Sequence, residues 1–202
     1  MSAPARLVVL ISGNGSNLQA ILDACRSGAL PAKVAAVISN KSDAYGLERA
    51  RLAGLPALAL PKRKELDRLD YDCMLAEQVA AFQPDWIVLA GWLRLLSLEF
   101  LGRFPGRVVN IHPALPGAFP GLEAIERAFA AWQRGVIDHS GVMIHLVPDE
   151  GVDSGPVLAQ ERIDFLPGDT LESFAQRMHT LEHRLYVETL HHLVTQVQSC
   201  ER

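Results

Sequence analysis

The chain has 202 residues, 49% of them hydrophobic and 21% charged, which is the composition of a globular protein long enough to bury a full core. Its formal net charge of -4 at pH 7 argues against a protein whose main task is to hold nucleic acid by neutralising phosphates. Three widely spaced cysteines, Cys25, Cys73 and Cys200, form no paired motif, which argues against a disulfide framework and favours a reducing compartment.

Strand-like apolar runs alternate with segments of helical period through the first half of the chain. We predict strands over residues 7–12, 34–39, 57–60, 86–90 and 107–112, and helices over 18–24, 44–52 and about 67–82. Runs that are apolar on both faces are typical of a parallel sheet covered by helices on both faces. The first run is interrupted by Gly13 and Asn14, so we expect neither a signal peptide nor a membrane span and interpret the protein as soluble and cytoplasmic.

The second half of the chain predicts a change in strand direction. A helix over 123–134 leads into two closely spaced strands, GVMIHLV and PVLAQERI, which we expect to add to the sheet antiparallel. A long final helix begins near Leu171, with Asp169 as its candidate N-cap and Glu172 three residues later. Its buried side should comprise Leu171, Phe174, Met178, Leu181 and Leu185. No repeat or linker interrupts the pattern, so residues 1–202 are predicted to form a single domain.

The segment LVVLISGNGSNLQAIL, residues 7–22, predicts a strand, a glycine turn and a helix start in succession. Unpaired N–H groups and the positive end of the helix dipole meet at such a turn, which suits a phosphate. Gly13 and Gly15 meet only half of the dinucleotide fingerprint G-x-G-x-x-G, because Asn17 takes the place of its third glycine. From these residues alone, a monophosphate site and an ordinary tight turn are both open.

Three polar side chains form a candidate catalytic group. Ligands bind beyond the carboxyl ends of parallel strands, and there the strand RVVNIH ends with Asn110 and His112. One residue separates them, so in an extended strand both side chains leave the same face. Asp153 lies in the glycine-flanked loop DEGVDSGP. The alternatives are a core histidine for His112 and a turn-capping role for Asp153.

Five separated motifs, in order, resemble the glycinamide ribonucleotide formyltransferase family, the folate-dependent transferases of purine synthesis. They are ISGNGSNLQAI, SNK-DA-GLERA, VLAGWLRLLS, NIHPAL with FPGL, and GVDSGPVLAQ, followed by EH in the last helix. The resemblance implies a Rossmann-like formyltransferase fold with a mostly parallel central sheet, antiparallel strands near the C-terminal part, and helices on both faces. It also implies 10-formyltetrahydrofolate as the donor, 5-phosphoribosyl-glycinamide as the acceptor, and no metal.

The resemblance also implies which residues hold the two substrates. The positions that match the acceptor site are Gly15, Ser16 and Asn17 for the phosphate, and His179, Thr180, Leu181 and Glu182, with Glu182 as the partner of the amine. The positions that match the folate site are Arg68 near the benzoyl-glutamate end, Leu93, Arg94, Leu95 and Leu96 in the pteridine pocket, Asn110, and the closing loop Glu150, Gly151, Val152 and Asp153.

Asn110, His112 and Asp153 match the catalytic residues of the family. Attack of an amine on the formyl carbon creates a tetrahedral centre with an oxyanion, which donors placed beforehand and one cation stabilise. We expect the Asn110 amide and a protonated His112 to supply them. Asp153 is expected to keep the imidazole charged and to order a water that relays the proton.

Other classes of protein fit parts of the sequence. HTLEH at 179–183 satisfies H-x-x-E-H, an inverted zinc-protease motif, but little chain follows to supply a third ligand. A non-catalytic phosphate-binding domain would keep the GNGSN turn without needing Asn110, His112 and Asp153 together. Sugar-nucleotide formyltransferases share those three residues and stay an alternative. We therefore expect an enzyme acting on two small molecules, as a monomer or homodimer, without nucleic acid or membrane partners.

Overall fold

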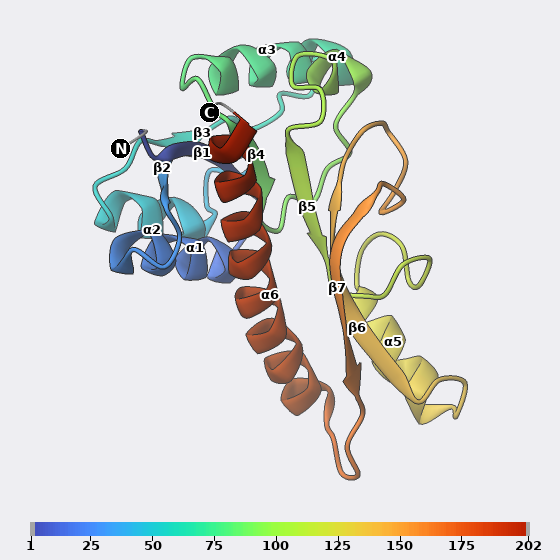
Figure 1. Cartoon of the computed structure of the whole chain (residues 1–202). Helices are drawn as coiled ribbons and strands as arrows, with labels where there is room; N and C mark the ends of the chain where they lie inside the picture. The colour runs from blue at the N-terminus through green and yellow to red at the C-terminus, as the bar shows by residue number, and fades with distance from the viewer. Residues whose placement is uncertain (1–2, 201–202) are drawn as a thin grey trace.

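A computed structural model describes residues 3–200, with side chains described through residue 196, so the side chain of Cys200 lies outside the described part. Within this range seven strands form one sheet in the order β3-β2-β1-β4-β5-β6-β7 (Figure 1). The strands are β1 (Ala5–Ile11), β2 (Ala32–Ser39), β3 (Ala57–Ala59), β4 (Trp86–Leu89), β5 (Val108–His112), β6 (His139–Leu146) and β7 (Val157–Asp164). The helices are α1 (Ser16–Ser27), α2 (Tyr45–Leu52), α3 (Arg68–Ala80), α4 (Leu98–Leu101), α5 (Ala124–Gln133) and α6 (Leu171–Cys200).

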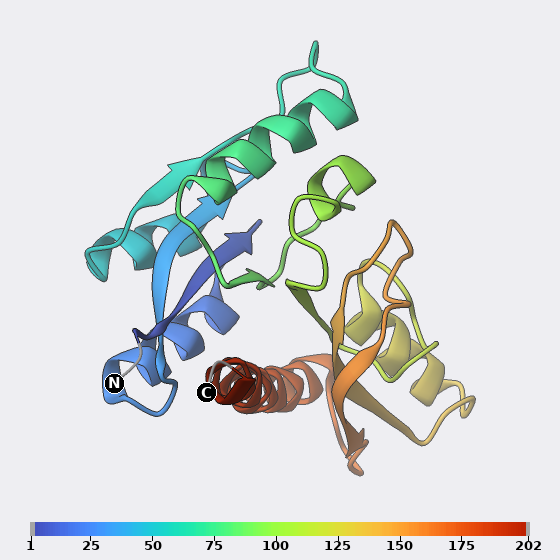
Figure 2. The same ribbon diagram turned by 45° about the horizontal axis from the view of Figure 1, so that its top comes forward.

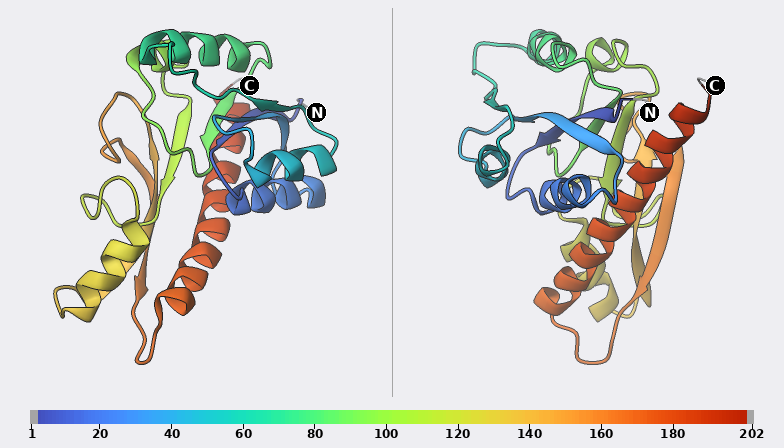
Figure 3. Two further views of the ribbon diagram at one scale, coloured as in Figure 1. Left: turned by 180° about the vertical axis from the view of Figure 1, so that it is seen from behind. Right: turned by 60° about the vertical axis from the view of Figure 1, so that its left-hand side comes forward.

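The five strands from β3 to β5 are parallel, as the doubly apolar runs predicted. In β1 the side chains alternate between two hydrophobic clusters, because successive residues of a strand point to opposite faces. Leu7 and Val9 belong to the cluster with α1 and α6, whereas Val8 and Leu10 belong to the cluster with α3 and α4. Helices therefore cover both faces, as Figures 2 and 3 show.

The strands β6 and β7 extend the sheet antiparallel, which confirms the prediction from their close spacing. The register between β5 and β6 places Asn110 opposite His145 and His112 opposite Met143. This pairing decides which side chains meet at the end of β5.

Three details of the helices differ from the prediction. Helix α4 was not expected, because four residues carry too little periodicity to be recognised. In α6 the capping pair is Thr170 and Ser173, not Asp169 and Glu172: Thr170 Oγ1 accepts the Ser173 N–H at 3.1 Å, and Ser173 Oγ accepts the Thr170 N–H at 3.0 Å. Leu171, predicted on the buried side, is 41% exposed because it lies in the first turn, beyond the sheet.

Tyr186 ties α6 to the centre of the sheet. Its hydroxyl is fully buried and lies 3.1 Å from the carbonyl oxygen of Leu89 in β4 and 3.0 Å from that of Val109 in β5. The end of β4 and the start of β5 are thereby held against one helix. Among the described residues, no helix is both long and apolar enough to cross a membrane.

Candidate active site

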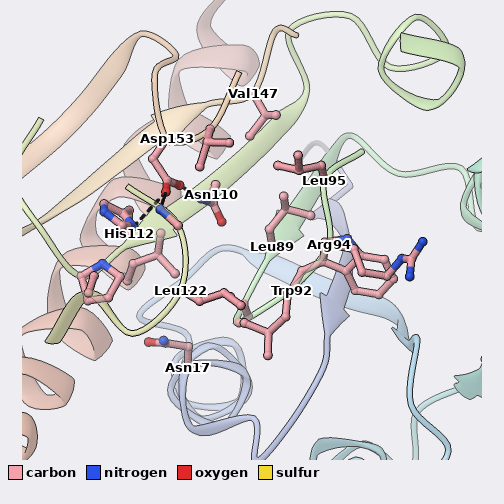
Figure 4. Close-up of a pocket in the computed structure, with 18 of the residues that line it drawn as sticks. Asn17, Leu89, Trp92, Arg94, Leu95, Asn110, His112, Leu122, Val147 and Asp153 are labelled. Carbon is pink, nitrogen blue, oxygen red and sulfur yellow. Dashed lines mark hydrogen bonds and ion pairs between the residues drawn. The ribbon is translucent and has the colours of Figure 1, made fainter. Parts of the chain in front are cut away.

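A cavity of about 590 Å³ lies beyond the carboxyl ends of β1, β4 and β5 (Figure 4). Six parts of the chain line it: residues 13–17, 89–96, 110–113 and 121–124, then His145 and Val147 with the loop 149–153, and two side chains of α6. This is the location that parallel α/β sheets use for ligands. The candidate residues fall into a phosphate-binding end, an apolar wall and a polar centre.

The start of α1 forms the candidate phosphate-binding end. Gly15 is its N-cap in the left-handed conformation, at φ 76°, and no side chain caps the helix. The first N–H groups of a helix have no acceptor within it, so together with the dipole they favour an anion. Asn17 also lines the cavity, and its Oδ1 atom is buried without a hydrogen-bond partner among the described residues. Gly15, Ser16 and Asn17 are thus brought together as predicted.

Helix α2 supports this turn from behind. The Gly46 N–H donates to the carbonyl oxygen of Gly13 at 3.1 Å, and a Cβ atom on Gly15 would lie 2.8 Å from the Cα atom of Gly46. Arg49 holds the same turn through its guanidinium, which donates to the carbonyl oxygen and to the side-chain oxygen of Asn14, both at 2.9 Å. The position of the turn therefore depends on two glycines that pack backbone against backbone.

An apolar wall follows β4. Leu93 and Leu95 are 53% and 47% exposed and line the cavity, while Trp92 and Leu96 also line it but are buried. Arg94 lies over the Tyr71 ring at 4.9 Å. Exposed leucines at a concave surface favour an apolar or flat aromatic ligand over water.

The loop 149–153 faces this wall. Glu150 accepts the Leu98 N–H at 3.0 Å and forms an ion pair of 3.1 Å with Arg68. Arg68, predicted to bind the donor directly, does not line the cavity itself. Both side chains of the pair are about 40% exposed, so the pair is open to competition from a ligand carboxylate.

The predicted catalytic residues meet around the Asp153 carboxylate. His112 Nδ1 lies 3.2 Å from Asp153 Oδ2, and the Asn110 amide nitrogen donates to Asp153 Oδ1 at 3.2 Å. The Gly121 N–H donates to Asp153 Oδ2 at 2.8 Å. Burial raises the pKa of Asp153, but the neighbouring His145 ring, the Gly121 N–H and His112 outweigh it, so this pKa lies below its usual range. The carboxylate is ionised at neutral pH.

Asp153 adopts the left-handed backbone conformation at φ 49°. This region is unfavourable for residues with a side chain, although Asp and Asn tolerate it best. Such a conformation is kept only where the surroundings determine it, and here the three contacts of the carboxylate do so.

The charge of His112 differs from our expectation. The ring is 3% exposed, and its Nε2 atom lies 3.3 Å from the carbonyl oxygen of Ala118. Burial lowers the pKa of His112 more than Asp153 and the Ala118 carbonyl raise it, so the net direction is below the usual value. The contact with Asp153 stabilises imidazolium as expected, but it does not keep the ring charged in the free protein. Asp153 and the Ala118 carbonyl could both accept a hydrogen bond from the ring only if both of its nitrogens carried a proton.

Asn110 also differs from the expectation that its NH2 group faces the substrate. His145 Nδ1 lies 2.8 Å from the carbonyl oxygen of Leu146, so this nitrogen carries a proton. The Asn110 amide nitrogen lies 3.1 Å from the Nε2 atom of the same ring and 3.2 Å from Asp153. The amide nitrogen is therefore engaged by these two side chains, and Figure 4 shows the amide oxygen turned away from Asp153.

Two of the four candidate residues in α6 reach the cavity. His179 and Glu182 line it, and His179 Nδ1 lies 2.7 Å from Glu182 Oε2. The contact with Glu182 raises the pKa of His179. Thr180 and Leu181 do not line the cavity, because intervening residues of a helix turn to other faces, and their part in acceptor binding stays a prediction. Thr180 Oγ1 donates to the Gln176 carbonyl, and Leu181 is buried in the core.

The histidines of HTLEH acquire no third ligand among the described residues, since no group of three or more His, Cys, Asp or Glu side chains there could hold a metal ion. The sequence reasoning missed the contribution of the Gly121 N–H and did not fix that of His145. His145 shares a strand face with Met143, but the sequence alone does not show whether that face meets the site, because it does not give the strand register.

Comparisons with known proteins agree with this geometry. The sequence model of the formyl transferase family matches residues 5–190. Phosphoribosylglycinamide formyltransferase of Schizosaccharomyces pombe is 46% identical over 95% of this chain and 98% of the relative. The protein of the same name in Escherichia coli is 43% identical over 89% and 82%. A crystal structure of glycinamide ribonucleotide transformylase 1 from Symbiobacterium toebii has a TM-score of 0.90 at 44% identity and covers 97% of this chain and 90% of that one.

A half-buried carboxylate shared by an amide and an imidazole, between a helix start and an apolar wall, is thus found in a chain that matches these enzymes over nearly its whole length. The chain belongs to the formyl transferase family, among the phosphoribosylglycinamide formyltransferases.

Proposed function

We propose that the protein transfers the formyl group of 10-formyltetrahydrofolate to the amine of 5-phosphoribosyl-glycinamide. The observation that carries the proposal is the meeting of Asn110, His112 and Asp153 in one cavity with the start of α1. Membership of the formyl transferase family implies a folate-derived donor, and the names of the relatives favour the phosphoribosyl acceptor. The product amide belongs to purine biosynthesis.

The two substrates lie at opposite ends of the cavity in this proposal. The 5-phosphate rests on the N–H groups at Gly15, Ser16 and Asn17, and the amine lies near the Glu182 carboxylate. The pteridine packs against the exposed leucines of the wall and under the loop 149–153. Arg68 pairs with the carboxylate of the benzoyl-glutamate tail in exchange for Glu150.

The reaction begins with a neutral His112, in keeping with its lowered pKa. The uncharged amine attacks the formyl carbon, the carbonyl π bond breaks, and a tetrahedral centre forms with a positive nitrogen and an oxyanion. His112 takes a proton from that nitrogen through a water beside Asp153, and the resulting imidazolium is stabilised by the carboxylate. The same proton then passes to the folate nitrogen as its bond to carbon breaks.

Asn110 stabilises the oxyanion after one amide hydrogen turns from Asp153 to the substrate. The contact with Asp153 is the one released, since imidazolium formation neutralises part of the carboxylate charge. The hydrogen bond to His145 keeps the amide in position meanwhile. A donor placed at an oxyanion typically contributes roughly 10²- to 10³-fold in turnover.

We place the reaction in the cytoplasm and assign it to a single domain that acts as a monomer or homodimer, with no nucleic acid or membrane partner. The long helix α6 contributes His179 and Glu182 to the cavity and packs in the same hydrophobic cluster as β1 and α1, which supports one catalytic unit.

The test is a spectroscopic assay of tetrahydrofolate release from 10-formyltetrahydrofolate with 5-phosphoribosyl-glycinamide, water or a sugar amine as acceptor. We expect turnover with the ribonucleotide alone and its loss in His112→Ala, with ligand binding retained. Release with the sugar amine but not with the ribonucleotide would reassign the acceptor. Binding without turnover in every arm would leave a phosphate-binding protein and refute the enzyme.

A further inference from the structure

Ser12 is the first residue after β1 and lies between the two ends of the cavity. The phosphate-binding turn, residues 13–15, follows it directly, and the apolar wall, residues 91–96, lies beside it at the end of β4. The side chain of Ser12 is only 2% exposed. A buried hydroxyl at such a junction must find its partners within the protein.

The hydrogen bonds of Ser12 join three strand ends. Its Oγ atom donates to Asn40 Oδ1 at 2.7 Å and accepts the Leu93 N–H at 2.9 Å. Its own N–H donates to the carbonyl oxygen of Gly91 at 2.9 Å. The hydroxyl thus donates its one hydrogen to the end of β2 and accepts a hydrogen bond from the segment after β4.

The Leu93 N–H is the group through which Ser12 holds the apolar wall. Leu93 is 53% exposed in the cavity, so its side chain contributes to ligand contact while its backbone is held by Ser12. The residue after Ser12 begins the turn that carries the phosphate site. One hydroxyl therefore sets the wall at a fixed distance from the turn, although it is not itself part of the cavity lining.

We propose that Ser12 is a positioning residue that sets the distance between bound donor and bound acceptor. The inference rests on the proposed function, because it assigns the turn and the wall to different substrates. Without the hydroxyl, the turn and the wall each keep their contacts with their own substrate, but the formyl carbon and the amine lose their alignment. A displacement of about 1 Å between reacting groups can cost about 10²-fold in rate.

The experiment compares Ser12→Ala with the wild-type protein in two measurements. The first is kcat with both substrates saturating, which should fall roughly 10- to 100-fold. The second is calorimetric binding of 5-phosphoribosyl-glycinamide alone and of tetrahydrofolate alone, where each Kd should change by less than about threefold. The binding stoichiometry must match the wild type, which separates misalignment from loss of folded protein.

Ser97→Ala is the matched control. Ser97 directly follows the wall and does not line the cavity; it is fully buried, and its hydroxyl has no hydrogen-bond partner among the described residues. Removing it should leave kcat and both Kd values unchanged. A fall in kcat of the same size in this control would show that any small cavity at the wall slows the reaction, and would overturn a specific role for Ser12.

Unchanged kcat in Ser12→Ala, with an active wild-type protein, overturns this inference alone, whereas absence of turnover in the wild type overturns the proposed function. Should Ser12→Ala not fold, Asn40→Ala decides, because it removes the acceptor that orients the Ser12 hydroxyl. We expect Asn40→Ala to lower kcat by a smaller factor than Ser12→Ala would, and an unchanged kcat in it counts against the inference.

Discussion

At the residue scale, the candidate site is organised by one carboxylate with three partners. Asp153 accepts from Asn110 and from the Gly121 N–H, and it faces His112. Because the carboxylate is largely removed from water, each of these contacts is stronger than at a surface. A substitution that keeps the shape of Asp153 but removes its charge should therefore separate the effect of the charge from that of the geometry.

Asp153→Asn is that substitution, since Asn also tolerates the left-handed backbone at this position. The variant should fold and bind both substrates, but kcat should fall about 10²-fold or more because the imidazolium formed on His112 loses its counter-ion. Steady-state kinetics measures the fall in kcat, and the thermal midpoint of unfolding shows whether the variant folds. A variant that keeps wild-type kcat would contradict the assigned role of the carboxylate.

The acid limb of the pH profile reports on His112. The proposed reaction starts from the neutral ring, so activity should be lost as the pH falls through a pKa that lies below the usual 6.5. Asp153 raises that pKa, so Asp153→Asn should move the limb to still lower pH. The measurement is kcat/KM against pH for both proteins. An acid limb that moves to higher pH in the variant would contradict the predicted direction of the shift.

At the element scale, the phosphate turn depends on α2 packing behind it. A Cβ atom on Gly46 would lie 2.4 Å from the Ile11 Cδ1 atom and 3.3 Å from the Gly15 Cα atom. Gly46→Ala should therefore push the turn or α2 aside. Since forced overpacking costs roughly 1–3 kcal/mol, we expect the KM for the acceptor to rise about tenfold while the KM for the donor stays unchanged.

Leu52→Ala is the control for Gly46→Ala, because Leu52 is on the same helix and 76% exposed. It should leave both KM values at their wild-type levels. An equal rise of both KM values in Gly46→Ala would indicate general loss of structure rather than a displaced phosphate turn.

The contact of α6 with the strand ends predicts a loss of stability in Tyr186→Phe. The substitution leaves the carbonyl oxygens of Leu89 and Val109 without this donor, which should lower the free energy of unfolding by about 1–3 kcal/mol. Urea denaturation measures it. Tyr71→Phe removes a hydroxyl that bonds one carbonyl, at Leu60, and should cost less. An equal or larger loss in Tyr71→Phe would contradict the importance of the double contact.

At the scale of the whole molecule, the two hydrophobic clusters share one sheet and should unfold together. Because the side chains of β1 alternate between the two clusters, independent unfolding of either face is unfavourable. We predict one cooperative transition for residues 1–202, with equal calorimetric and van't Hoff enthalpies. Two transitions in scanning calorimetry would divide the chain into two domains.

Much of the fold was predictable because the pattern of the sequence is strong. Runs that are apolar on both faces identified the parallel strands, and the short connection between Leu146 and Val157 identified the antiparallel pair. Helix α4 was not predictable from four residues, and the cap of α6 was displaced by one residue because Asp169, Thr170 and Ser173 are all suitable capping residues.

The candidate site was predictable in its membership but not in its electrostatics. Motifs place Asn110, His112 and Asp153 beside each other, yet the lowered pKa of His112 depends on burial by segments remote in sequence. The engagement of the Asn110 amide depends on the β5–β6 register, which brings His145 opposite to it. Sequence spacing contains neither burial nor register, so these features needed coordinates.

One of the three tryptophans, Trp92, lines the cavity, whereas Trp132 is stacked on Phe165 at 4.8 Å in the aromatic group near α5. The indole N–H of Trp92 is buried without a partner among the described residues. Occupancy of the cavity should therefore alter the intrinsic fluorescence of the unlabelled protein, and Trp92→Phe should abolish the response. The molecule contains its own optical probe of folate binding.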